Sequence, residues 1–207
     1  KYFKLSQSIK NANNFSEIYD FLVSIWPDPN EIINKEFSIE KIQSFIEKSS
    51  SNQNNLVLSD LENYLSYDIL TKLDRASMYS SLETRSPFLD HRIAEYVLPL
   101  PWKYKSRGGF NRNQNKWLLR KILYKYVPRN LVDRPKKGFS IPIGTWLKGP
   151  LRSWAEDLLD PNLIKSQGYL DNSVIRKYWA ELLEGNTNNS SKIWTVLMWQ
   201  AWLLEWT

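Results

Sequence analysis

The sequence has no cysteine, one histidine and only seven glycines among its 207 residues. Without cysteine, a disulfide framework, a thiolate metal site and a thiol nucleophile are all excluded, and a reducing cytoplasm is the expected compartment. A single histidine, His91, cannot build the usual zinc site, so we interpret it as structural. No glycine precedes Gly108. The first half of the chain therefore cannot hold a glycine-rich phosphate loop, which needs backbone conformations that glycine provides.

Long apolar runs are also missing. The longest, Ile193–Trp206, is interrupted by Thr195, Gln200 and Glu205, and it is shorter than the roughly 20 residues that span a bilayer. We therefore expect no membrane association. The chain begins at Lys1 and not at Met, so we expect that preceding residues have been removed.

Aromatic and basic side chains are abundant. Aromatic residues make up 14% of the chain, which predicts a packed globular protein and argues against disorder. The net charge of +6 suits an anionic ligand such as polyphosphate or nucleic acid, but it is equally an ordinary aid to solubility.

The apolar periodicity predicts a mainly α chain with little or no β-structure. Apolar residues recur at helical spacing, and no alternating run of strand length has turn residues at both ends. Between the expected helices, 49–55, 99–109 and 133–145 look like loops. The expected helices are 15–26, 38–46, two within 56–82 that meet near 67–69, one from the cap Asp90 to 98, 117–126, 146–159 with a restart at Gly149-Pro150, 171–183 and 190–206.

Two segments concentrate charge in positions that suit chemistry. The segment 70–91 places six charged residues among apolar ones, which is typical of a structural network of ion pairs; these are Lys72, Asp74, Arg75, Glu83, Arg85 and Asp90. In the segment 133–143, Lys136 and Lys137 precede Gly138. A lysine on a loop that closes over a ligand suits phosphoryl or nucleotidyl transfer, while a solvated basic turn is the alternative.

A third segment, 120–137, carries seven basic residues against Asp133 alone. Its basic face fits a polyphosphate, and the neighbouring Trp117, Tyr124 and Tyr126 fit base stacking in a nucleic-acid site. A solvated helix face explains the same pattern.

Taken together, these segments resemble the asparagine synthase domain of glutamine-hydrolysing asparagine synthetases. The resemblance is strongest over 56–160, continues through terminal helices at 161–207 and is loosest over 1–55. It implies that 1–207 is the helical C-terminal portion of an α/β adenine-nucleotide-hydrolase-like synthetase domain. The matching motifs, in the family's order and spacing, are Asp74–Met78, Leu82–Asp90, Arg134–Phe139, Pro142, Trp146 and Gly149–Leu151.

The resemblance implies an ATP-dependent ligase of amide synthesis. Such an enzyme adenylates a carboxylate, usually that of aspartate, and transfers ammonia from glutamine to give asparagine. ATP and Mg²⁺ would be the cofactors, bound mainly by an upstream part. This sequence has neither the glutaminase domain with its cysteine nor the Ser-Gly-Gly-x-Asp-Ser pyrophosphate loop. We therefore expect it to need a missing N-terminal chain and to be inactive alone.

The resemblance also assigns roles to single residues. Lys136 matches the lysine that stabilises the charged transition state. Glu83 matches the motif glutamate, which in relatives that make cyclic amides helps to orient the reacting amine and that lysine. Lys137 is a second candidate for binding the phosphates. Arg85 and Asp90 belong to the same motif as Glu83 and would hold the substrate site in shape. No metal ligand is implied.

Two other functions fit the same residues. One is a helical binding module whose basic face takes an acidic partner, although we do not expect nucleic acid to be the ligand. The other is a divergent member of the family that amidates a sugar carboxylate in surface polysaccharide synthesis. The sequence leaves the oligomeric state open, a homodimer included.

Overall fold

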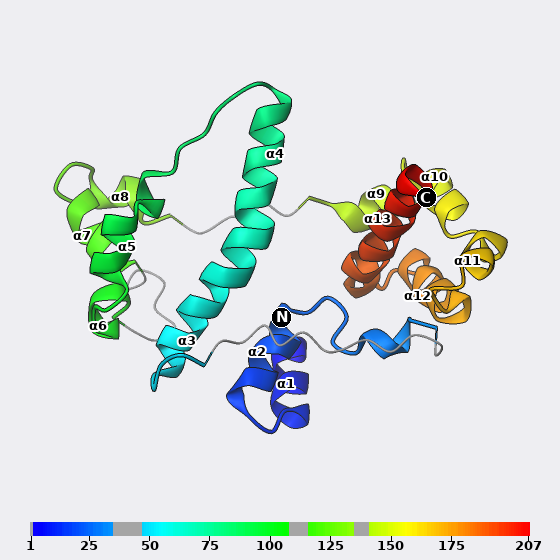
Figure 1. Ribbon diagram of the computed structural model, residues 1–207, viewed down its shortest axis with the longest axis horizontal. Coiled ribbons are helices and arrows are strands. Elements are labelled where there is room, and N and C mark those ends of the chain that lie inside the picture. The colour runs from blue at the N-terminus through cyan, green and yellow to red at the C-terminus, as the bar shows by residue number, and fades with distance from the viewer. Residues whose placement is uncertain (1, 35–46, 108–115, 135–140) are drawn as a thin grey trace. The chain divides into compact units, whose positions relative to one another are not determined.

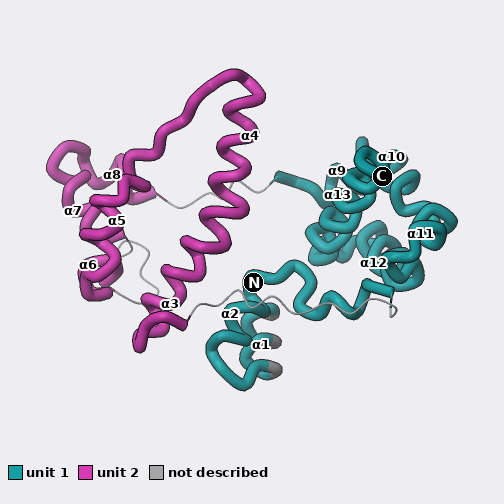
Figure 2. The backbone as a smooth tube through the Cα atoms, viewed as in Figure 1, with its two compact units in different colours: residues 1–43, 139–207 teal, residues 44–138 magenta. Residues whose placement is uncertain are grey.

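The computed structural model describes residues 2–34, 47–107, 116–134 and 141–207, which fall into two compact units (Figures 1 and 2). Unit 1 joins residues 1–43 to 139–207, and unit 2 is 44–138. Within the described ranges, helices are the regular structure, and an isolated antiparallel bridge joins Ile33 and Leu170. The prediction of a mainly α chain is confirmed. The helix expected at 38–46 lies outside the described residues.

Unit 1 begins with a helix pair and ends with five α-helices and one short 3-10 helix. A reciprocal cap starts α2: the Asn14 side chain accepts the Glu17 amide at 2.9 Å, and the Glu17 carboxylate accepts the Asn13 amide at 2.9 Å. The pair is α1 (Tyr2–Asn11) and α2 (Phe15–Val23), and η1 (Pro29–Glu31) follows; the later helices are α9 (Ile143–Lys148), α10 (Arg152–Leu158), α11 (Pro161–Gln167), α12 (Asn172–Leu183), η5 (Thr187–Asn189) and α13 (Ser190–Trp206).

The sequence predicted some of these boundaries: the helix expected at 15–26 ends at Val23, and α1 was not predicted. The restart near Gly149-Pro150 and the helices at 171–183 and 190–206 are confirmed. Helix α11 was missed, although Asp160-Pro161 is a strong start signal. The Asp160 carboxylate accepts the amides of Asn162 and Leu163 at 2.9 and 3.0 Å, and Pro161 stands where no amide hydrogen bond is required.

The core of unit 1 lies between α9, α10, α12 and α13. Trp179 is 1% exposed, and it donates its indole N–H to Glu156 at 2.7 Å, so its polar edge is satisfied. Apolar residues from all five late helices and from the segment before 34 close around it. The buried members are Ile32, Leu147, Ala155, Leu158, Leu159, Ile164, Ile175, Leu182, Ile193, Val196 and Leu197.

The segment 26–34 is tied to the late helices although more than 130 residues separate them along the chain. The Asp171 amide donates to the Ile32 carbonyl at 2.7 Å, and the Asn34 amide donates to the Tyr169 carbonyl at 2.9 Å. The Trp26 ring meets the Tyr178 ring edge-on, with centroids 5.3 Å apart. These contacts join the two sequence-distant parts into one unit.

Unit 2 is built around one long helical run. The π-helical segment η2 forms its middle, and shorter helices follow it in the chain. The elements are α3 (Asn52–Ser59), η2 (Asp60–Leu70), α4 (Thr71–Tyr79), η3 (Pro87–Leu89), α5 (His91–Val97), α6 (Trp102–Lys105), α7 (Trp117–Leu123) and α8 (Arg129–Val132).

The expectation of a loop over 49–55 is wrong, because α3 begins at Asn52. Asn55 is 3% exposed, and its side chain accepts the Ser49 amide and donates to the Ser49 carbonyl, both at 2.9 Å. The polar residues therefore fold the incoming chain against the first helical turn. The loop expected over 99–109 also contains a helical turn, α6, entered from Pro101.

The break expected near 67–69 is also wrong, because the helical run continues from 52 to 79. Its sequence contains neither proline nor glycine. Ser66 and Thr71 donate their hydroxyls to the carbonyls five residues earlier, at 2.9 and 3.1 Å. These side-chain hydrogen bonds match the wider i→i+5 spacing of a π-helix. The chain thus stays helical through the expected break and forms no loop there.

The two units differ in how much apolar surface they bury. Every buried apolar side chain in the described ranges belongs to unit 1, from Tyr19 to Leu203. In unit 2 the buried side chains are polar, namely Asn55 and Ser59, while Phe88 and Tyr67 are 64% and 80% exposed. Burial of apolar surface is the main favourable contribution to folding. The described part of unit 2 therefore gains little stability from burial within itself.

Candidate functional site

The loop between α4 and α5 carries the motif residues Glu83 and Arg85. Their side chains form an ion pair with each other, and they are 69% and 87% exposed. An ion pair this open to water contributes little to stability. The pair therefore leaves both charged groups available to a ligand, and it keeps the Glu83 carboxylate next to a cation.

Asp90 closes this loop and starts α5. Its carboxylate accepts the Arg92 amide at 2.9 Å, the Arg92 Nε at 2.9 Å and the Arg92 Nη2 at 2.7 Å. The hydrogen bonds from the Arg92 side chain, and to a lesser extent the one from the Arg92 backbone amide, hold the pKa of Asp90 below its usual range. The predicted cap is confirmed. The carboxylate works here as a helix cap with a two-pronged arginine partner.

The charges of 70–91 form local pairs. Lys72 lies 3.1 Å from Asp68, one turn earlier on the same helical run. Glu83 pairs with Arg85, and Asp90 pairs with Arg92. Each pair joins residues at most four positions apart, so these contacts are short-range and do not build the single network that the sequence suggested.

Lys136 and Lys137 lie outside the described residues. The described chain reaches Arg134, and it is fixed at Asp133. The Asp133 carboxylate accepts from Arg120 Nη1 at 2.5 Å and from the Tyr124 hydroxyl at 2.7 Å. Arg120 and Asp133 are 22% and 23% exposed. Because a partly buried ion pair is less screened than a surface one, this cluster anchors the chain just before the lysines.

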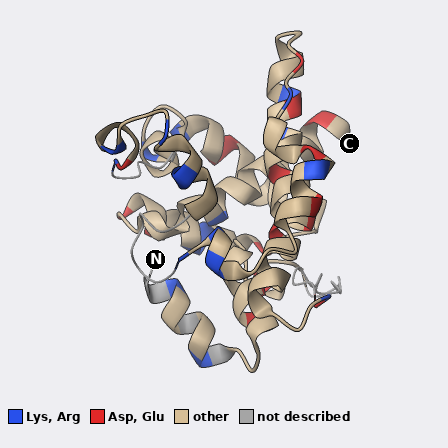
Figure 3. Cartoon of the chain, turned by 90° about the vertical axis from the view of Figure 1, so that its left-hand side faces the viewer, with Lys and Arg blue, Asp and Glu red and all other residues tan. Residues whose placement is uncertain are grey.

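The basic segment is therefore less free than its sequence suggested. Arg120 is engaged with Asp133, and the Arg129 guanidinium lies 4.7 Å from the centre of the Tyr124 ring. Tyr126 is 80% exposed. Lys and Arg positions are spread over many helices of the chain (Figure 3), and the basic side chains of 120–134 partly serve local structure.

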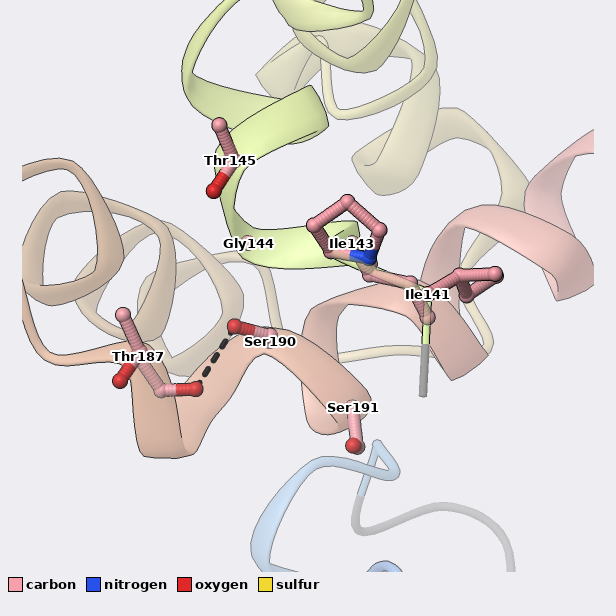
Figure 4. Close-up of a pocket in the computed structure, with 8 residues that line it drawn as sticks. Ile141, Ile143, Gly144, Thr145, Thr187, Ser190 and Ser191 are labelled. Atoms are coloured by element: carbon pink, nitrogen blue, oxygen red, sulfur yellow. Dashed lines mark hydrogen bonds between the residues drawn. The ribbon is translucent and has the colours of Figure 1, made fainter. Parts of the chain in front are cut away.

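A pocket of about 260 Å³ follows the lysine segment in the sequence, where α9 meets the start of α13 (Figure 4). A Cβ added to Gly144 would come within 2.6 Å of the Ser190 hydroxyl, so glycine permits this close approach. The Ser190 hydroxyl donates to the Thr187 carbonyl at 2.6 Å. The lining is apolar and hydroxyl-bearing and has no charged side chain; it consists of Ile141, Pro142, Ile143, Gly144, Thr145, Thr187, Ser190 and Ser191.

Neither a metal site nor a membrane span is found in the described ranges. No three carboxylate or imidazole side chains there gather closely enough to hold a metal ion. The motif carboxylates Glu83 and Asp90 already have arginine partners, so these residues do not fit a Mg²⁺ site. None of the helices described is both long and apolar enough to cross a bilayer.

The structure thus brings Glu83 and Arg85 together and separately commits Asp90 to a helix cap. The cluster of Arg120, Tyr124 and Asp133 was not recognised as a unit from the sequence. Its signal was present: Arg120 and Tyr124 stand four apart on one face of a helix, and Asp133 is the lone acid of a basic segment.

Comparison with known proteins gives a consistent result. The family model described as asparagine synthase matches residues 7–204. Asparagine synthetase [glutamine-hydrolyzing] 1 of Bacillus subtilis is 32% identical over 159 residues, which are 76% of this chain and 24% of that protein. No solved structure gives a significant match.

Two further relatives match a shorter part. Asparagine synthetase [glutamine-hydrolyzing] 3 of Bacillus subtilis is 34% identical over 108 residues, 48% of this chain and 17% of that protein. Amidase chyE of Penicillium rubens is 31% identical over 100 residues, 47% of this chain and 15% of that protein. The chain spans about a quarter or less of the length of the curated relatives that it matches. With the family match extending over nearly its whole length, the chain belongs to the asparagine synthase family.

Proposed function

We propose that this chain is part of an ATP-dependent amidotransferase that converts a carboxylate, with aspartate as the first candidate, into an amide. The observation that carries the proposal is the family match over residues 7–204, which includes the segments around Glu83 and Lys136. ATP, the carboxylate and glutamine or ammonia are the proposed substrates.

The proposed reaction has two steps. A carboxylate oxygen of the substrate attacks the α-phosphorus of ATP, and pyrophosphate leaves. Ammonia then attacks the activated carbonyl carbon, and AMP leaves with the electrons of the broken C–O bond. Negative charge develops on phosphate oxygens in the first step, so a lysine placed there lowers the barrier. We assign this role to Lys136, with Lys137 as a second cation.

Glu83 has a complementary proposed role. Its exposed carboxylate can accept hydrogen bonds from an amine, and Arg85 keeps a positive charge beside it. Arg85 and Asp90 would maintain this part of the site, Asp90 by fixing where α5 begins. The described residues do not fit Mg²⁺, so no step is assigned to that ion.

We also propose that the chain does not carry out this reaction alone. It has no cysteine for a glutaminase nucleophile, and its glycines cannot form the phosphate loop. Unit 2, which contains Glu83, buries no apolar side chain in its described part. These three features support a site that is completed by chain beyond these residues.

The substrate is tested by ATP–pyrophosphate exchange with the natural gene product that contains this chain. We expect exchange that depends on aspartate. Exchange with a uronic-acid sugar, and none with aspartate, would instead support a divergent member of the family that amidates a sugar carboxylate. A third outcome is that no carboxylate promotes exchange, while an RNA oligonucleotide binds with an affinity that falls steeply as salt is raised. The hypothesis of a helical binding module would then replace the proposal.

A further inference from the structure

Residues 26–34 join α2 to the late helices, and we call them the strap. One end of the strap is attached by main-chain hydrogen bonds. The Asp171 amide donates to the Ile32 carbonyl at 2.7 Å, and the Asn34 amide donates to the Tyr169 carbonyl at 2.9 Å. Both bonds break if the strap lifts away, so these two amides report whether it lies on the late helices.

The other end of the strap is attached through Lys192, near the start of α13. The Lys192 ammonium donates to the Tyr178 hydroxyl at 3.0 Å and lies 3.6 Å from a Glu31 carboxylate oxygen. The Tyr178 hydroxyl donates to the other carboxylate oxygen of Glu31. The same ammonium lies 4.3 Å from the centre of the Trp26 ring and 4.2 Å from the centre of the Tyr178 ring. A single cation thus contacts two strap residues and one residue of α12, and we call these four residues the latch.

The surroundings of Lys192 strengthen these contacts. Its side chain is 21% exposed, and that of Glu31 is 40% exposed. Partial burial leaves the ion pair less screened than a surface pair, and a cation beside aromatic rings gains more as water is excluded. Because the ion pair and both ring contacts depend on one ammonium, removing its charge weakens all of them together.

The closed latch also leaves one polar group unsatisfied. The Trp26 indole N–H is buried and has no hydrogen-bond partner among the described residues. A buried donor without a partner costs free energy, and that cost is recovered when the group reaches water. The charge of Lys192 therefore holds the strap closed against an opposing contribution from Trp26, and such a balance favours local opening.

The late helices keep most of their core without the strap. Ile32 is the strap's buried member of the core cluster, and the remaining buried members in the described ranges lie between Leu147 and Leu197. None of them comes from α1 or α2. Opening of the strap would therefore release the start of the chain and leave the packing among α9 to α13 largely in place.

We propose that the latch is a conformational device that sets how often the strap opens as one unit while α9 to α13 stay folded. The device does not depend on the proposed amidotransferase activity. With Lys192 in place, the closed form is favoured. When the contacts of Lys192 are lost, the hydrogen bonds at the far end of the strap, at Ile32 and Asn34, break more often as well.

The test is hydrogen exchange in the natural gene product that contains this chain, measured by mass spectrometry at the amides of Asn34 and Asp171. Lys192→Met removes the ammonium and keeps an apolar stem of similar length. We expect exchange at both amides to become about tenfold faster, while exchange within α13 changes by less than about twofold. Both amides donate to backbone carbonyls and not to the latch side chains, so this result requires that the strap opens as a unit.

A second variant and a control complete the design. Glu31→Gln keeps the shape and removes the other charge of the ion pair, so it should also speed exchange at both amides. Combined with Lys192→Met it should add less than about twofold, because the two residues act through one contact. Lys177→Met changes an exposed lysine beside Tyr178 on α12 and should leave both amides unchanged.

Three results would overturn the proposal. Unchanged exchange at Asn34 and Asp171 in Lys192→Met would show that the latch does not control the strap. Equally faster exchange throughout α13 would show that Lys192 stabilises the whole unit. Fully additive effects of Glu31→Gln and Lys192→Met would show that these residues do not form one latch. Where Lys192→Met prevents folding, Glu31→Gln alone decides between faster exchange at both amides, which supports the latch, and unchanged exchange, which refutes it.

Discussion

Gln200 offers a direct test of how unit 1 is packed. Its side chain is 0% exposed on α13, and neither its Oε1 nor its Nε2 has a hydrogen-bond partner among the described residues. A buried amide without partners costs about 1–3 kcal/mol on the scale of protein mutations. Methionine has nearly the same length and volume and no amide. We therefore expect Gln200→Met to raise the free energy of unfolding by about 1–3 kcal/mol.

The change is measured by urea unfolding followed through near-UV circular dichroism, which reports the packed tryptophans of unit 1. The midpoint should rise while the slope with urea stays the same, because the surface exposed on unfolding is unchanged. Gln53→Met on the exposed side of α3 is the control, with an expected change within about 0.5 kcal/mol. Gln200→Ala should destabilise through the cavity that it leaves. An unfolding free energy lowered by Gln200→Met would show that the amide makes favourable hydrogen bonds, which would refute the reasoning.

Two further predictions concern titratable groups. Burial first, and then the hydrogen bond to Glu31, raise the pKa of Tyr178. The folded state therefore keeps this proton longer than the unfolded state does, and the associated stability is complete below about pH 10 and lost as pH rises through the higher folded pKa. Urea unfolding of Tyr178→Phe should show a smaller loss of stability above pH 10 than the parent; identical profiles would contradict the assignment. Asp90→Ala removes the cap of α5 and should destabilise its first turn, seen as faster hydrogen exchange at the Arg92 amide. Unchanged exchange there would show that the cap contributes nothing.

Helices α12 and α13 of unit 1 were predictable because each carries its own signal. Asp171 is an N-cap, and the apolar periodicity of 171–183 and 190–206 is visible without any knowledge of contacts. Where prediction failed, the deciding interaction was between side chain and backbone. The Asn55 side-chain amide bonds to the Ser49 backbone and holds the start of α3, in a segment so polar that the sequence predicted a loop. The π-helical geometry depends on hydroxyl bonds from Ser66 and Thr71.

The candidate site was predictable only in part, for a similar reason. Motif order located Glu83 and Asp90, and the cap at Asp90 followed from local sequence. The ion-pair partners of Glu83 and Asp90 did not follow from local sequence, because Arg85 and Arg92 could equally have paired with other carboxylates. The ion pair between Arg120 and Asp133 joins residues 13 positions apart and depends on the turn between α7 and α8. The sequence alone therefore suggested that the basic side chains of this segment were free to bind a ligand.

The central claim is that this chain supplies the lysine of an adenylating site. The most direct measurement is aspartate-dependent pyrophosphate release by the natural gene product and by its Lys136→Ala variant, with glutamine hydrolysis followed in parallel. We expect pyrophosphate release to fall by about 10²–10³-fold, the usual loss when one group that stabilises transition-state charge is removed, while glutamine hydrolysis stays near the parent value. Unchanged pyrophosphate release per folded molecule would contradict the account.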